Sequence, residues 1–235
     1  MGLDVYVGSL TRYHSGNWEL IAQKVARELG MDIQVIRQEP GPAVSVDPGQ
    51  IRDDVLRWRD SLTESLRQHL VSSLNWDERS ESPYFTDKPT WECYADLLLW
   101  AAYDEQHRLR RPEQHVEDWS EDPAYRISSG SGAQSLYSHL YDVSAWLPCD
   151  FEFLFDAKDI AGVDLRFGSS VKLLAQLATL NERTWQASAE ELDKWRKDGA
   201  EHGVPLEVGA RFAFALFYAL AAAAVDHNLP TRLDW

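Results

Sequence analysis

The chain has 235 residues, of which 44% are hydrophobic and 26% are charged, and its formal net charge is −15 at pH 7. This composition is typical of a folded protein rather than a disordered one, and one hydrophobic core can serve this length, so we expect a single domain over 1–235. The excess of carboxylates argues against direct contact with nucleic acids or anionic membranes, because it repels their phosphates.

The two cysteines, Cys93 and Cys149, stand far apart and form no C-x-x-C pair. Such spacing favours buried, reduced thiols over a disulfide framework or a zinc site. The chain opens without the basic region and apolar run of a secretory signal. We therefore expect a cytoplasmic protein with no membrane association and no bound cofactor.

The first predicted elements alternate between strand and helix. Residues 3–7 are typical of a strand, and a helix capped by Asn17 and closed by Gly30 follows. Alternating apolar and polar residues predict a second strand over 31–36, which ends at the Pro-Gly-Pro loop at 40–42. This order favours a βαβ unit at the start of the chain.

The middle of the chain predicts two long helices and a polar stretch. Apolar residues that repeat every three or four positions predict one amphipathic helix over about 48–74. A second helix, over about 91–108, is apolar on all faces in its middle and is expected to be buried. Prolines and a Ser/Gly run make 111–132 irregular, and 134–142 is predicted to form a short helix.

The last third of the chain predicts a hairpin and three helices. Alternating phenylalanines over 151–155 and a short apolar run over 163–167 predict the two strands of the hairpin. Serines and a proline mark the starts of the three helices, at Ser169 or Ser170, at Ser188 and at Pro205. The uncharged run of the last helix, 212–225, is shorter than the roughly 20 residues needed to cross a bilayer. It is expected to be a core helix.

In chain order these elements predict an α+β fold that is mainly helical. A small sheet, built from the N-terminal strands and a hairpin near 151–167, is expected to pack against a helical layer. The sequence has no fixed-period repeat, which excludes solenoids and propellers.

Polar residues gather where the first predicted strand runs into the first helix, a position that often presents functional groups. This N-terminal cluster consists of Asp4, Tyr6, Arg12, Tyr13, His14, Asn17 and Glu19. If the protein is an enzyme, a hydrolase using histidine and carboxylate groups is the expected class, with Asp4, Tyr6, His14 and His139 as catalytic candidates. The ordinary alternative is that His14 packs a loop and Asn17 only caps a helix. Residues 2–13 are similar to a bacterial sequence signature, a similarity that implies no activity.

A metal-dependent version of the hydrolase would draw on two acid and imidazole pairs. Asp104-x-x-His107 and His139-x-x-Asp142 each place a carboxylate and a histidine on one helix face, if both segments are helical. Two such helices packed together would offer two His and two Asp ligands to a divalent metal. The same spacing is common on solvated helix faces, so the expectation is that no metal is bound.

An acidic segment with a tryptophan at its centre is the preferred binding candidate. It consists of Glu113, Glu117, Asp118, Trp119, Glu121 and Asp122, with no Lys or Arg inside it. A second run, 150–164, holds five carboxylates against Lys158. Carboxylates beside an aromatic anchor are typical of an interface for a basic protein. The sequence therefore favours an acidic protein-binding module, of the inhibitor or immunity type, that neutralises a basic partner.

Overall fold

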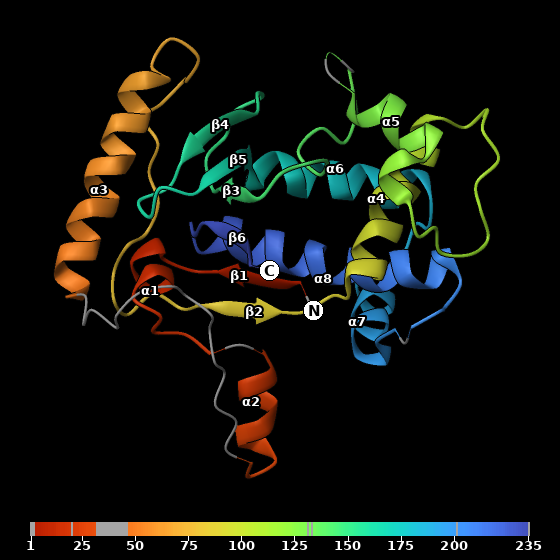
Figure 1. Ribbon diagram of the computed structural model, residues 1–235, viewed down its shortest axis with the longest axis horizontal. Helices are drawn as coiled ribbons and strands as arrows, with labels where there is room; N and C mark the ends of the chain where they lie inside the picture. The colour runs from red at the N-terminus through yellow and green to blue at the C-terminus, as the bar shows by residue number, and fades with distance from the viewer. Residues whose placement is uncertain are drawn as a thin grey trace.

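A six-stranded sheet runs through the middle of the molecule (Figure 1). The computed structural model describes residues 3–19, 21–31, 47–130, 132, 134–200 and 202–234. Its strands, in chain order, are β1 (Asp4–Val7), β2 (Phe85–Asp87), β3 (Ala145–Leu147), β4 (Phe155–Lys158), β5 (Asp164–Ser169) and β6 (Thr231–Asp234). Their order across the sheet is β2-β1-β6-β3-β5-β4, so neighbours in space are mostly distant in the chain.

The sheet is mixed, and most of its pairs are antiparallel. β1 lies antiparallel to β2 on one side and to β6 on the other, with Val5 opposite Asp87 and Leu233. β6 pairs antiparallel with β3, β3 runs parallel to β5, and β5 forms a hairpin with β4. The hairpin is as predicted, but its first strand is β4 at Phe155–Lys158 and not the predicted 151–155. Both edges of β1 are therefore occupied by antiparallel strands. The predicted second strand over 31–36 lies outside the described residues apart from Met31.

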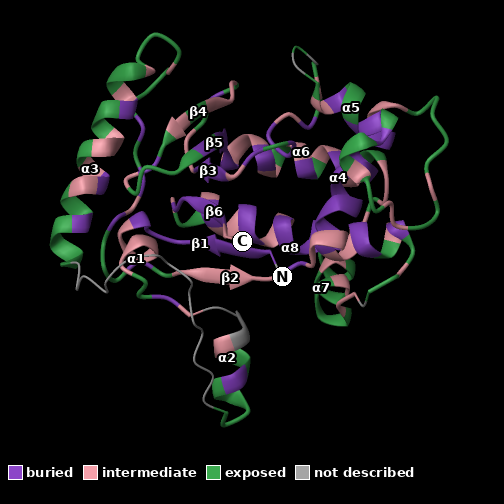
Figure 2. Cartoon of the chain, in the orientation of Figure 1, coloured by how far each residue is buried: buried purple, intermediate pink, exposed green. Residues whose placement is uncertain are grey.

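One face of the sheet packs against a layer of helices. This layer contains α4 (Trp91–Glu105), α6 (Ser170–Arg183), α7 (Ala189–Asp198) and α8 (Leu206–Asp226). The main core joins β1 and β6 to α4, α6 and α8, and Figure 2 shows α4, α8 and β1 largely buried. These elements confirm the predicted fold class, a mainly helical α+β protein with a small sheet under a helical layer.

The opposite face of the sheet carries a second, smaller core beneath α1 (Leu10–His14) and α3 (Pro48–Ser65). In β3 the alternation of a strand divides the residues, because Trp146 belongs to the main core while Ala145 and Leu147 belong to the second. The start of α3 is as predicted, with Asp47 accepting from the Gly49 N–H.

The predicted end of α3, near residue 74, is wrong. The helix ends at Ser65, and the chain turns so that Leu70, Leu74 and Trp76 pack onto the same second core as the helix itself. Leu74 and Trp76 are therefore buried and Leu70 half-buried, in a turn that folds back on the helix, whereas Val71 is fully exposed.

The structure around residue 130 differs from the prediction in two places. The stretch predicted to be irregular contains a helix, and the segment predicted to be a short helix is not helical. Within 111–132 the chain forms a 3-10 turn, η1 (Trp119–Glu121), and a helix, α5 (Pro123–Ser129), capped by Asp122. The helix predicted over 134–142 is wrong, because this segment is a series of turns. Side chains bind its backbone N–H groups in place of a helical ladder: Ser135 accepts from Tyr137 and Gln176 from His139.

The last helix is a core helix, as predicted. Among the described residues α8 is the one helix long and apolar enough, by length and composition, to cross a membrane, yet 56% of its most apolar stretch is buried inside the molecule. It lies between α4, α6 and α7 and touches β1, β2 and β6. Its apolarity is therefore explained by burial against protein on several sides.

Candidate functional site

A cleft of about 970 Å³ lies where α2 (Ile21–Glu28), α7 and α8 surround the edge strand β2. In Figure 1, α2 projects from the body of the molecule beneath β2. All three residues of β2 line the cleft, and α8 contributes a patch of small or apolar residues, Ala219, Leu220 and Ala223. The volume lies within the range of small-ligand and peptide sites.

The upper wall of the cleft is the turn that connects α1 to α2. Gly16 has a φ of 67°, a left-handed conformation that glycine adopts without strain. This turn lets Trp18 fold back, where its ring stacks on Tyr13 with a centroid distance of 5.6 Å and packs on Tyr6 at 4.8 Å. The aromatic packing fixes the point from which α2 departs.

Cationic side chains dominate the wall of the cleft. Four of them line it: Arg12, Lys24, Arg27 and Arg196. Among the described residues two carboxylates, Glu19 and Asp87, line it as well, so the described part of the wall has an excess of two positive charges. The whole chain carries −15. This wall is therefore a positive site on an acidic molecule, and its field favours an anion.

Two of the four cations are already engaged. Arg12 donates to the backbone oxygens of Ser80 and Ser82, both at 2.6 Å, and its guanidinium lies 5.0 Å from the centre of the Tyr84 ring. Arg27 pairs with Glu19 at 2.8 Å.

Lys24 and Arg196 are exposed and form no ion pair with any residue that the structure describes. These two side chains, one on α2 and one on α7, are therefore the cations that a ligand would meet.

Asp87 is the carboxylate at the base of the cleft. Burial raises its pKa, while the Lys88 N–H, which donates to Oδ1 at 2.9 Å, and the charges of Arg196 and Lys24 act in the opposite direction. The net change is a rise, so burial outweighs these opposing effects on the pKa of Asp87.

The catalytic candidates at the N-terminus are not brought together. Asp4 pairs with Lys88 at 3.1 Å. Tyr6 is fully buried and donates to the Ser9 carbonyl at 3.0 Å, and burial raises the pKa of its phenol. Three other members of the N-terminal cluster do line the cleft: Arg12, Asn17 and Glu19.

His14 lies beside the second core, where it lines a small cavity together with Leu10 and Trp58. Its Nε2 is 4.0 Å from Oδ2 of Asp159, which also accepts a bond from Arg232. Burial lowers the pKa of His14 to about 4, and the charge of Asp159 offsets only part of that effect. The cavity beside it measures about 10 Å³, space for at most one water molecule and not for a substrate.

His139 is a core residue with both ring nitrogens in use. Nδ1 accepts from the Ser169 N–H at 2.9 Å, and Nε2 lies 3.4 Å from the Glu152 carbonyl. Because Nδ1 is an acceptor, the proton belongs on Nε2. Burial lowers the pKa of His139 and keeps the ring neutral.

The metal candidates are likewise separate. Asp104 accepts from Tyr137 at 2.5 Å and from Arg183 at 2.6 Å, and Asp142 accepts from Tyr125 at 2.7 Å. His107 is exposed beyond the end of α4, so it does not share a helix face with Asp104. In the described part of the chain no group of three or more His, Cys, Asp or Glu side chains is placed to hold a metal ion.

The acidic segment is more neutralised than its sequence suggested. Glu113 lies 3.9 Å from Arg110 and Glu121 lies 3.1 Å from Arg126, so cations just outside the segment face its carboxylates. Asp122 is buried, caps α5 and accepts from Tyr103 at 2.9 Å.

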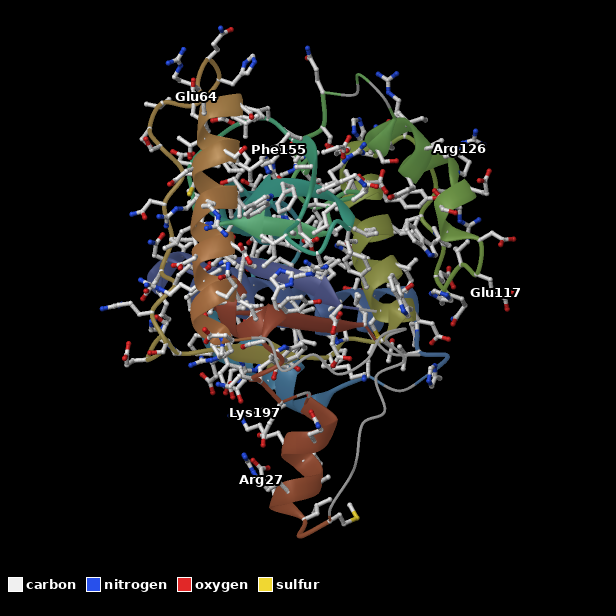
Figure 3. All side chains as sticks on the ribbon, turned by 60° about the vertical axis from the view of Figure 1, so that its left-hand side comes forward. Arg27, Glu64, Glu117, Arg126, Phe155 and Lys197 are labelled. Atoms are coloured by element: carbon white, nitrogen blue, oxygen red, sulfur yellow. The ribbon has the colours of Figure 1, made fainter. Side chains whose placement is uncertain are left out.

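Trp119 is half-buried and packs edge-on against Tyr125, with 4.9 Å between ring centroids. It holds the segment to the core and is not a free anchor. Glu117 and Asp118 are exposed and form no ion pair among the described residues. Glu117 lies at the edge of the molecule in Figure 3.

The second acidic run is paired in the same way. Lys172 binds both Asp150 and Glu152, at 2.9 and 2.5 Å. Arg166 pairs with Asp156 at 2.9 Å, so cations from β5 and α6 balance carboxylates that are unopposed in the local sequence. Counting charges within a short window overestimates the acidity of both runs.

Several residues of interest have little signal in the sequence. Lys24 and Arg27 stand three apart on a predicted helix, a spacing that already puts both on one face. Nothing local connects them to Arg196. A buried acid and imidazole pair was also missed: Asp96 Oδ1 lies 2.8 Å from His115 Nδ1, and burial raises the pKa of Asp96 to about 6. Asp96 lies in the apolar run of α4, where a carboxylate is unexpected.

In comparisons with known proteins, no family model, no curated protein and no solved structure matches this chain. Its function is therefore inferred from the geometry of the cleft and from the surface charges.

Proposed function

We propose that this protein is a binding protein whose cleft, between α2, α7 and β2, takes an anionic ligand. The supporting observation is that Lys24 and Arg196, from separate helices, line one cavity without an ion-pair partner among the described residues. Like charges that face a shared cavity repel one another unless an anion or solvent relieves them. Cations are outnumbered by carboxylates in this protein. Two of them lining one cavity are therefore better explained by a bound anion than by a general role in solubility.

The other two cations of the wall, Arg12 and Arg27, add positive charge to the site. Arg12 is held by Ser80, Ser82 and Tyr84 and presents a fixed positive charge. Because its side chain is already ordered, it costs little conformational entropy when a ligand arrives. Arg27 can exchange Glu19 for a ligand carboxylate or phosphate, since an exposed pair of this kind contributes little.

Charge reversal on α7 tests the proposal. The probe is inorganic tripolyphosphate, titrated by calorimetry into the full chain at low ionic strength. We expect Arg196→Glu to weaken binding at least tenfold, because it removes one free cation and adds a repelling charge. The matched control is Lys194→Glu, an exposed lysine on the same helix that does not line the cleft, and it should bind within about twofold of the original chain. Equal affinity in both variants, or no binding by the original chain, would contradict the proposal.

A second candidate function is that of an acidic module that binds a basic protein, in the manner of an inhibitor or immunity-type protein. The observation that favours it is the pair of exposed carboxylates, Glu117 and Asp118, without ion pairs in the described part of the chain. Trp119, the first residue of η1, and Asp122, the residue after it, anchor the turn, and the two carboxylates lie directly before it. Ordering before binding lowers the entropic cost of association.

The hydrolase alternative gains no support from the geometry. Burial lowers the pKa of both His14 and His139 and keeps them neutral, and the two rings contact different residues. Neither ring contacts Asp4 or Tyr6. The pocket beside His14 holds about 10 Å³. A hydrolase needs room for its substrate beside the base.

A further inference from the structure

We infer that the ligand of the cleft is an extended acidic peptide that adds as a strand to the edge of β2 that no described strand occupies. This inference rests on the proposed function and names its ligand class. It goes further by assigning a role to the backbone of β2 as well as to the cations around it.

β2 is an edge strand of the sheet. Its one neighbour among the described strands is β1, on the side away from the cleft wall, while Phe85, Thr86 and Asp87 all line the cleft. No loop or helix in the described chain makes a backbone hydrogen bond to these three residues. An edge strand presents backbone donors and acceptors on its open side, which is the template used when a peptide is added to a sheet.

The chemistry of the wall selects an acidic strand. α2 and α7 supply Lys24 and Arg196, which have no ion-pair partner among the described residues, whereas α8 supplies the apolar patch at Ala219, Leu220 and Ala223. A peptide that carries both acidic and apolar residues would therefore place carboxylates beside the cations and apolar side chains beside α8.

A compact anion fits this wall less well than a peptide. Arg12 donates to two carbonyl oxygens and Arg27 pairs with Glu19. The two cations of the wall without an ion pair in the described part of the chain therefore lie on two separate helices. A single phosphate needs several donors that converge on one point. Carboxylates spaced along a strand can meet separated cations.

The shortness of β2 and the charge of Asp87 also limit unspecific pairing. Short, charged edges are a common defence against aggregation. Three residues of backbone pairing contribute little binding energy by themselves. A peptide strand therefore binds β2 only if the cations of the cleft also hold its carboxylates. Specificity of this kind combines an attractive feature with a repulsive one.

The experiment measures fluorescence anisotropy of a labelled, end-capped peptide that alternates glutamate and valine, with the full-length protein. We expect it to bind, and we expect the same peptide with alternate backbone nitrogens methylated to bind at least tenfold more weakly, because methylation removes ladder donors without changing charge. A lysine-for-glutamate peptide should not bind. Amide hydrogen exchange at Phe85, Thr86 and Asp87 should slow when the acidic peptide is present.

The protein variants separate this inference from the proposed function. Arg196→Glu should weaken the acidic peptide at least tenfold and Lys194→Glu should leave it within about twofold, with folding of each checked by circular dichroism. If tripolyphosphate binds in an Arg196-dependent manner but the peptide does not, the cleft still binds anions and the strand-addition inference is wrong. Equal binding of the methylated peptide overturns it too, since charge alone would then suffice. If neither probe binds, both proposals fail.

Discussion

At the scale of single residues, burial decides the protonation of His14. Burial beside Asp159 and Arg232 lowers the pKa of His14 to about 4 in the folded protein, from an ordinary value near 6.5. The unfolded chain therefore binds more protons than the folded one between about pH 4 and 6.5. The stability linked to this group is present above that window and is lost as the pH falls through it.

A comparison with His14→Gln tests this linkage. We expect the unfolding free energy of the original chain to fall by on the order of 2 kcal/mol more than that of the variant between pH 7 and pH 4.5, since each pKa unit corresponds to about 1.4 kcal/mol. Urea unfolding followed by circular dichroism at the two pH values provides the measurement. Parallel pH dependence in the two proteins would show that His14 is not the titrating group.

At the scale of elements, α7 matters to the cleft because it carries Arg196. Its first turn is closed by a capping box, in which Ser188 and Glu191 each bind the other's backbone N–H. None of its side chains is fully buried, although Leu192 and Trp195 pack against the main core, so the cap adds to this tertiary contact.

Removal of the cap tests this contribution. We expect Ser188→Ala to lower the unfolding free energy by about 1 kcal/mol, the usual value of an N-cap. Ser61→Ala, at an exposed position inside α3, is the control and should change it by less than about 0.5 kcal/mol, because it removes no cap. If both serines give the same change, the capping box is not what stabilises α7.

At the scale of the whole molecule, both the net charge of −15 and local contacts can attract a basic protein, and a test must separate the two. Reversing Glu117 and Asp118 changes the total charge by four units, as does reversing Glu182 and Glu190, two other exposed carboxylates. The two double variants therefore alter the long-range field to a similar extent but differ in which surface they change. This pairing separates a specific contact from general attraction.

If the segment around Trp119 binds a basic protein, the Glu117→Lys, Asp118→Lys variant should associate at least tenfold more slowly at low salt. The difference should shrink at high salt, because ions screen the field. The Glu182→Lys, Glu190→Lys variant should show a smaller loss. Binding kinetics at two ionic strengths against a basic protein recovered by affinity capture give the result, with egg-white lysozyme as a non-specific cation. Equal kinetics for the two double variants would remove the support for this segment.

Local patterns predicted the elements whose signals lie within a few turns of the chain. The capping residues Asp47, Ser169 and Ser188 mark true helix starts, and the hairpin β4–β5 forms across the predicted connection. Caps, helical periodicity and short hairpins depend on neighbours in sequence, so one sequence suffices to locate them.

By itself the sequence determined the fold class, the buried character of α4 and α8, and the overall acidity of the protein. Only the tertiary structure decided which strands pair, since β1 meets β2 and β6 from distant parts of the chain. It also decided which charges are neutralised, as Lys172 does for Asp150. The cleft likewise joins Lys24 to Arg196 through packing of separate helices on one sheet edge. These contacts join residues that are far apart in the chain, and the spacing of residues along one sequence does not give the distance between them in the fold.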